Sequence, residues 1–87
     1  MSIPSRDLSV ARARNLRFKA TWRAARGKKW LPLRDDIPSL EEAYQFALSQ
    51  DCPEVALWVK TLSGNSLYWG SDDPELFNSL ALQEGYS

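Results

Sequence analysis

The sequence contains no histidine and only one cysteine, Cys52, in 87 residues. Histidine is the most frequent general base near neutral pH, so its absence excludes the common catalytic triads and dyads. A single cysteine cannot form an intrachain disulfide, and without a histidine to activate its thiol we expect Cys52 to be incidental rather than nucleophilic. The sequence therefore predicts a protein that is not an enzyme.

Long apolar runs are also missing. No stretch approaches the roughly 18 consecutive apolar residues that span a membrane, and residues 1–10 lack the apolar core of a signal peptide. The low cysteine content suits a reducing compartment. We expect a cytoplasmic protein that does not contact a membrane.

Glycine is scarce, and its four copies are dispersed, so none belongs to a phosphate-binding loop. The acidic pairs Asp35–Asp36 and Asp72–Asp73 offer oxygen ligands for a hard cation such as magnesium. Each pair precedes a predicted helix, however, where helix capping is the preferred explanation. We expect no cofactor and no metal.

What the chain does have is material for a core. Apolar residues make up 44% of it, including four tryptophans, three tyrosines and three phenylalanines, and its length suits one compact domain. We predict a single α+β domain over residues 16–87, preceded by a basic N-terminal arm or extension over residues 1–15. Two structures stay open for that arm, because its residues are compatible with a short helix from Ser5 or with an extension of the first strand.

Residues 16–34 predict a β-hairpin. Apolar and polar side chains alternate from Leu16 to Ala24, which is the period of a half-buried strand. A turn over residues 25–28, with Gly27 supplying a positive φ, leads into a second strand over residues 29–34.

The length of the hairpin loop decides which face Trp30 lies on. A two-residue loop, which we favour, gives the opposed pairs Trp22–Leu31, Ala20–Leu33 and Arg23–Trp30, with the last pair on the outer face. A three-residue loop would turn Trp30 inward, because a slip of one residue reverses every side chain.

A helix is predicted from Ser39 to about Gln50. Ser39 is the N-cap, and Glu42 three residues later completes a capping box. Phe46 lies off the apolar stripe. The stripe that would pack on a sheet consists of Leu40, Ala43, Tyr44, Ala47 and Leu48.

The remaining residues predict a second hairpin and a second helix. Val55–Leu62 is apolar on both faces, as expected of a central strand, and Leu67–Trp69 begins a short fourth strand after a turn. Asp72 or Asp73 would cap a last helix starting at Pro74, with Leu76, Phe77 and Leu80 on its apolar side. The predicted fold is α+β, in the order ββαββα, with two helices packed on one face of an antiparallel sheet.

Charge is segregated along the chain although the net charge is zero. Residues 1–34 hold ten basic side chains and one acidic side chain, a net charge of +9. Residues 35–87 hold ten acidic side chains and Lys60, a net charge of −9. The basic third is the strongest functional signal in the sequence.

Arginine and lysine neutralise phosphates, and an aromatic side chain among them can stack on an unpaired base. We therefore predict a non-enzymatic binding module that contacts nucleic acid, or another anionic surface such as an acidic protein, through the basic hairpin and its arm. The candidate binding residues are Arg12, Arg14, Arg17, Lys19, Arg23, Arg26, Lys28, Lys29, Trp30 and Arg34.

Four alternatives remain open. In the first, the hairpin presents a solvated strand face on which lysine and arginine discourage edge-to-edge aggregation. The cations would simply pair with the protein's own acids, especially those of the helix starting at Ser39 or the pair Asp72–Asp73. The protein would instead be a small inhibitor or adaptor of the phage or plasmid type that docks on a protein, with an acidic face that imitates nucleic acid. Finally, the basic face of one molecule would meet the acidic face of another, which predicts salt-sensitive self-association.

Overall fold

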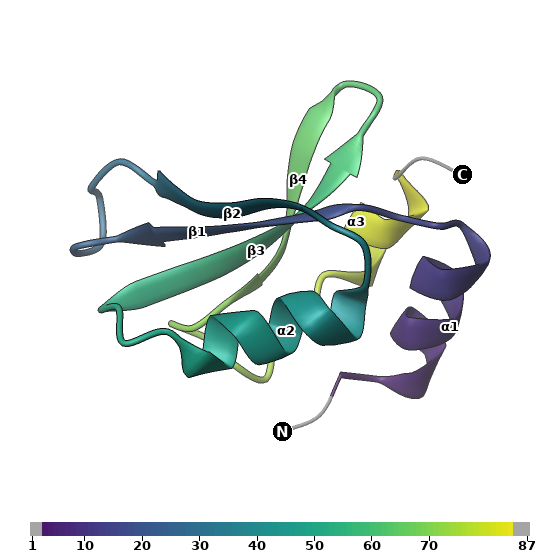
Figure 1. Ribbon diagram of the computed structural model, residues 1–87, viewed down its shortest axis with the longest axis horizontal. Helices are drawn as coiled ribbons and strands as arrows, with labels where there is room; N and C mark the ends of the chain where they lie inside the picture. The colour runs from purple at the N-terminus through teal and green to yellow at the C-terminus, as the bar shows by residue number, and fades with distance from the viewer. Residues whose placement is uncertain (1–2, 85–87) are drawn as a thin grey trace.

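The computed structural model describes residues 3–84, which form a four-stranded antiparallel sheet and three helices (Figure 1). The strands lie in the order β2-β1-β3-β4, so β1 and β3 are central. The predicted α+β class and antiparallel sheet are confirmed; the predicted order ββαββα is incomplete, because a helix precedes the first strand. The elements are α1 (Ser5–Ala13), β1 (Phe18–Arg23), β2 (Leu31–Ile37), α2 (Leu40–Ser49), β3 (Glu54–Thr61), β4 (Gly64–Gly70) and α3 (Ser79–Gln83).

Helix α1 occupies most of the region that was predicted as a basic arm or extension; residues 1, 2 and 85–87 lie outside the described residues. It begins after Pro4 with no side-chain cap and ends at Ala13; beyond its C-cap, Asn15 has a left-handed φ of 52°. The Leu16 N–H donates to the Ala11 carbonyl across this turn, a Schellman-type ending. A helix with so weak an N-terminal signal is stabilised by its packing, with Asp7 and Ala11 buried.

The core lies between one face of the sheet and the helices. Phe18 and Ala20 in β1 and Leu57 and Val59 in β3 are fully buried, and α2 packs across the three strands β1, β2 and β3. Figure 1 shows α2 running along this face, with α1 beside one of its ends. Helices α1 and α3 contact each other, and α3 also contacts β4.

The register of the first hairpin agrees with the two-residue loop only near the turn. Trp22 lies opposite Leu31 as predicted, but Ala20 lies opposite Arg34 rather than Leu33. Two irregularities in the β1–β2 pairing cause this shift. Asp36 adopts a left-handed φ of 54°, which aspartate tolerates, and this edge strand bulges there.

Helix α2 begins at its predicted N-cap, but the predicted capping box is only half formed, because the Glu42 carboxylate pairs with Arg34. The apolar stripe differs from its prediction at one position. The Glu42 N–H donates to Ser39 Oγ at 3.4 Å, so Ser39 is the N-cap. Leu40, Ala43, Tyr44 and Ala47 are buried as expected. Leu48 is 54% exposed, and Phe46 is partly buried against the core in its place.

The predicted last helix from Pro74 is wrong. Residues 71–78 form turns along β4, and α3 begins only at Ser79 and is five residues long. The Trp69 indole donates to the Pro74 carbonyl at 3.1 Å, and the Asn78 N–H donates to the Tyr68 carbonyl at 2.8 Å. These hydrogen bonds hold the segment against the edge of β4, which prevents an earlier helix start.

None of the helices formed by residues 3–84 has the length and apolarity needed to cross a membrane.

Candidate nucleic-acid interface

The sheet face opposite the helices carries a distinct set of side chains, which we call the open sheet face. Along β1 and β3 these side chains alternate with the buried, helix-facing residues, as the period of a strand requires. The open sheet face comprises Arg17, Lys19, Thr21, Arg23, Trp30, Pro32, Trp58, Lys60 and Asn65.

Two indoles form its centre. The rings of Trp30 and Trp58 lie edge to face, with centroids 6.2 Å apart and an interplanar angle of 84°. The Trp58 indole N–H donates to Thr21 Oγ1 at 2.8 Å, which fixes the orientation of the indole; Thr21 is only 5% exposed. Both rings are partly buried, so each keeps some accessible surface.

Arg23 holds one side of this pair in place. Its guanidinium carbon lies 4.2 Å from the Trp30 ring centroid, a cation–π contact. Its Nε and Nη2 atoms each donate to a Glu54 carboxylate oxygen at 3.2 Å, a bidentate pair whose side chains are both 16% exposed. The charge of Arg23 is therefore balanced within the protein, and its role on this face is to support Trp30.

A shallow depression of about 210 Å³ opens beside the two indoles. Its lining combines aromatic surface with hydrogen-bonding groups and one ammonium, that of Lys19. It is lined by Lys19, Thr21, Trp30, Pro32, Trp58 and Asn65. Aromatic surface beside a cation is the chemistry that a planar, anionic ligand would use.

The other end of the open sheet face is electrically neutralised. Lys60 Nζ lies 2.9 Å from Asp35 Oδ1 and 3.9 Å from Asp36 Oδ1, and Arg17 lies 3.8 Å from Asp36. The hydrogen bond from Lys60, followed by that from the Asp36 N–H, lowers the pKa of Asp35 below its ordinary value. An anion would gain little binding energy at this end, because Asp35 and Asp36 already form ion pairs with Lys60 and Arg17.

The tip of the β1–β2 hairpin is the most exposed basic part of the chain. Gly27 has a φ of +85°, and the Lys28 N–H donates to the Ala25 carbonyl at 3.1 Å to close the turn. Arg26 makes an exposed contact of 3.7 Å with Asp72. Within residues 3–84, Lys28 and Lys29 are exposed and have no acidic group within ion-pair distance.

Two of the predicted candidates instead contact the start of α2. Arg12 forms an ion pair with Glu41, and Arg34 Nη2 lies 3.0 Å from Glu42 Oε1. The Arg34 guanidinium also lies 5.5 Å from the Phe46 ring centroid. For these two arginines, the alternative in which the cations pair with acids of the helix starting at Ser39 is therefore confirmed.

A third candidate, Arg14, binds the end of α3. Its Nη1 atom donates to the carbonyls of Leu82 at 3.2 Å and Gln83 at 2.7 Å. A cation at a helix C-terminus satisfies carbonyls that have no partner within the helix. The structure therefore gives Arg14 a role in joining α1 to α3.

The ten candidates thus fall into two groups. The open sheet face and the adjoining hairpin bring together Arg17, Lys19, Arg23, Arg26, Lys28, Lys29 and Trp30. Arg12, Arg14 and Arg34 lie apart and contact helices.

The sequence pattern did not identify Trp58 or Lys60 as members of this face; alternation along the first strand put Thr21 there, but not as a binding candidate. The pattern placed Trp58 in a strand that is apolar on both sides, which hid the indole N–H and its partner Thr21. The only signal in the sequence that could have placed Trp58 and Lys60 on this face was the alternation within β3. These two residues share one side of the strand, opposite Leu57 and Val59.

The described part of the chain holds no group of three or more His, Cys, Asp or Glu side chains that could bind a metal ion. Comparisons with protein-family models, with curated proteins and with solved structures found no match.

Proposed function

We propose that this protein is a non-enzymatic binding module that holds a single-stranded nucleic acid on the open sheet face, while the tip of the β1–β2 hairpin contacts its phosphates. The observation that supports this most is the depression beside Trp30 and Trp58, which lies next to Lys19 and on the same hairpin as the exposed Lys28 and Lys29.

The aromatic pair favours a single strand over a duplex. Bases stacked in a duplex cannot present their faces to a protein, whereas unpaired bases stack on aromatic side chains and gain about 1–3 kcal/mol each. Trp58 is oriented by its hydrogen bond to Thr21, and Trp30 by Arg23. A platform fixed in advance loses less conformational entropy when a base stacks on it.

The distribution of charge gives the proposed path of the strand. Lys28 and Lys29 are free of nearby acids within residues 3–84, and the exposed contact of Arg26 with Asp72 is of a kind that contributes little and can exchange for a phosphate. At the opposite end Asp35 and Asp36 already neutralise Lys60 and Arg17, so this end does not attract phosphates. The backbone would therefore run from the hairpin tip over Lys19 and stop before the Asp35–Asp36 end.

The experiment is a titration by fluorescence anisotropy with labelled oligonucleotides of about 12 nucleotides, as single-stranded DNA, single-stranded RNA and duplex DNA. Each is measured at about 50 and 200 mM salt. Three or four phosphate contacts predict a slope of log K against log salt of roughly −2 to −3 for a single strand. Tighter binding of the duplex, or no binding at low salt, would contradict the proposal.

Charge-reversal variants locate the site. Lys28→Glu and Lys29→Glu should each weaken binding, because they place a carboxylate where a phosphate would lie. Arg6→Glu is the matched control, since it makes the same change in net charge at an exposed position of α1 outside the proposed site. Equal losses of affinity in all three variants would show that binding responds to net charge alone, which would contradict phosphate binding at the hairpin tip.

A further inference from the structure

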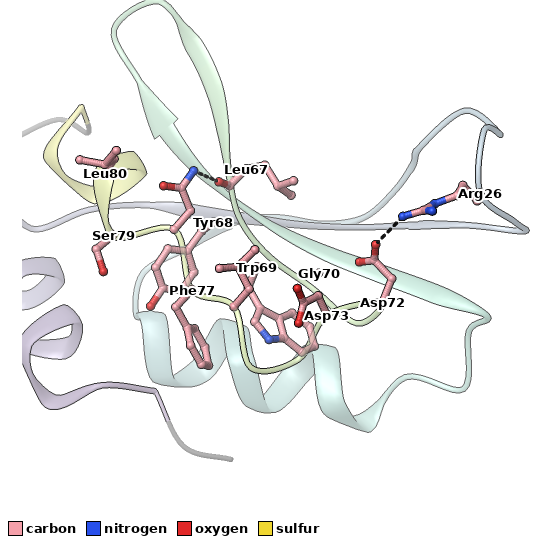
Figure 2. A pocket seen from close by; sticks show the side chains of 12 residues that line it. Arg26, Leu67, Tyr68, Trp69, Gly70, Asp72, Asp73, Phe77, Ser79 and Leu80 are labelled. Carbon is pink, nitrogen blue, oxygen red and sulfur yellow. Dashed lines mark hydrogen bonds and ion pairs between the residues drawn. The ribbon is translucent and has the colours of Figure 1, made fainter.

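A second surface lies beyond the edge of the sheet, between β4 and the segment that leads into α3. It is a groove of about 710 Å³, which we call the leucine groove (Figure 2). Figure 2 shows Phe77 and Trp69 directed toward α2, while Leu67 and Leu80 lie on the opposite side. The groove is lined by Arg26, Leu67, Tyr68, Trp69, Gly70, Asp72, Asp73, Leu76, Phe77, Asn78, Ser79 and Leu80.

Three leucines that line the groove have a large exposed fraction. Leu67 is 44% exposed, Leu76 63% and Leu80 69%. They come from β4, from residues 71–78 and from α3, yet they border one hollow. Scattered exposed leucines are normal, whereas several around one concave apolar surface are typical of an interaction site.

The walls of the groove are fixed by hydrogen bonds. The Asn78 side chain donates to the Leu67 carbonyl at 3.0 Å, and its backbone N–H donates to the Tyr68 carbonyl at 2.8 Å. The Trp69 indole donates to the Pro74 carbonyl at 3.1 Å. A groove held in this way exists before a ligand arrives, so binding does not first have to order residues 71–78.

The rim of the groove is acidic. Asp73 lines the groove, and Glu75 directly precedes the lining residue Leu76 in the sequence; both acids are exposed. Arg26 is the one basic residue among the lining residues, and it lies 3.7 Å from Asp72. Figure 2 marks this ion pair with a dashed line. A second copy placed groove to groove would bring the acidic rims together, which disfavours a symmetric dimer.

We propose that the leucine groove docks a short segment of a partner protein, in which apolar side chains are flanked by lysine or arginine. The apolar side chains would cover Leu76 and Leu80, and the basic ones would meet Asp73 and Glu75. Helix-in-groove recognition combines apolar anchors with complementary charge in this manner. The groove is a second site that meets the proposed nucleic-acid interface only at Arg26, and it differs from that interface in the sign of its charge.

A peptide library tests the proposal without a known partner. Random peptides of about 16 residues, displayed on phage, are selected on the wild-type protein and counter-selected on a Leu76→Ser/Leu80→Ser variant. We expect enriched sequences that combine leucine, isoleucine, phenylalanine or tryptophan with lysine or arginine. Failure to enrich any sequence, or enrichment of acidic ones, would overturn the proposal.

Binding of an enriched peptide is then measured by fluorescence anisotropy. The Leu76→Ser/Leu80→Ser variant should bind at least about tenfold more weakly, and Asp73→Lys should weaken binding of basic peptides. Leu62→Ser is the control and should leave the affinity unchanged, because Leu62 is 85% exposed in the turn between β3 and β4 and does not line the groove. Equal affinity in wild type and the leucine variant would refute the groove as the site; because both leucines are more than half exposed, the variant should keep the wild-type circular dichroism spectrum.

Sedimentation velocity separates a partner segment from a second copy of the chain. The proposal predicts a monomer for both the wild type and the leucine variant. A wild-type dimer that becomes monomeric in Leu76→Ser/Leu80→Ser would instead identify the groove as a self-association interface and overturn the assignment to another protein.

Discussion

The hydroxyl of Tyr68 in β4 donates a 2.6 Å hydrogen bond to Asp7 Oδ2 in α1, across 61 positions of sequence. Asp7 is only 2% exposed, and its other oxygen accepts a hydrogen bond of 2.8 Å from the Ser79 hydroxyl at the start of α3. Burying a carboxylate is costly unless donors surround it. This cluster therefore joins α1, β4 and α3, and it explains why a chain start with weak helix signals forms an ordered helix.

Removing the tyrosine hydroxyl should destabilise the fold measurably. In Tyr68→Phe, Asp7 Oδ2 loses its donor while it remains buried, and we expect a loss of about 1–3 kcal/mol in the free energy of unfolding. Urea denaturation checks this value. Ser66→Ala is the control, because it removes a solvent-exposed hydrogen bond to Glu84 and should cost less than about 0.5 kcal/mol. Equal losses in the two variants would show that Asp7 does not depend on Tyr68.

The same cluster predicts a loss of stability in alkaline solution. Burial, followed by the hydrogen bond to Asp7, raises the pKa of Tyr68 well above its ordinary value. A pKa raised in the folded state gives stability that is fully present below the unfolded pKa, roughly 10, and is lost as the pH rises above it. The free energy of unfolding should therefore fall above about pH 10, and less steeply in Tyr68→Phe. An identical pH dependence in both proteins would contradict this account.

At the acidic end of the pH scale the relevant pair is Lys60 and Asp35. Their contact lowers the pKa of Asp35, so its contribution to stability is present above the unfolded pKa and disappears as the pH falls through the folded one. In Lys60→Gln, the pKa of Asp35 measured by NMR should rise toward its ordinary value. Because Asp35 is exposed, the accompanying change in stability at neutral pH should be small, about 0–1 kcal/mol. An unchanged pKa would show that Lys60 is not the cause.

Glu54 balances Arg23, and removing its charge should strengthen binding of a single strand. Glu54→Gln leaves the Arg23 cation over Trp30 without a carboxylate, so we expect about two- to threefold tighter binding at low salt. Glu75→Gln makes the same change in charge away from the open sheet face and should have a smaller effect. Weaker binding by Glu54→Gln would indicate that the ion pair itself positions Trp30 for the ligand.

Elements that rest on local chemistry were predicted well from the sequence. Ser39 and Glu42 lie three residues apart, so the start of α2 was visible directly, and the glycine turn placed Trp22 opposite Leu31. Other features depend on residues far away in the chain. Helix α1 relies on Tyr68 and Ser79, and the late start of α3 relies on the Asn78 contacts with β4, neither of which leaves a periodic pattern.

The candidate site was predicted only in part, for a related reason. Charge along the chain indicated a basic hairpin, but it could not show which cations have acidic partners. Arg12 and Arg34 contact α2, and this depends on how the sheet and helix pack. Trp58 lies in the candidate site because β1 and β3 are neighbouring strands, and this pairing places Trp58 next to Thr21 and Trp30.

The most direct test of the central claim follows the indole N–H signals in a ¹H–¹⁵N NMR spectrum while a single-stranded oligonucleotide of about 12 nucleotides is added. Single Trp→Phe variants assign the signals. Binding on the open sheet face predicts that the signals of Trp30 and Trp58 shift. The signal of Trp69, whose indole donates to the Pro74 carbonyl, should stay in place. Unmoved Trp30 and Trp58 signals at saturating oligonucleotide, or a shift confined to Trp69, would contradict binding on the open sheet face.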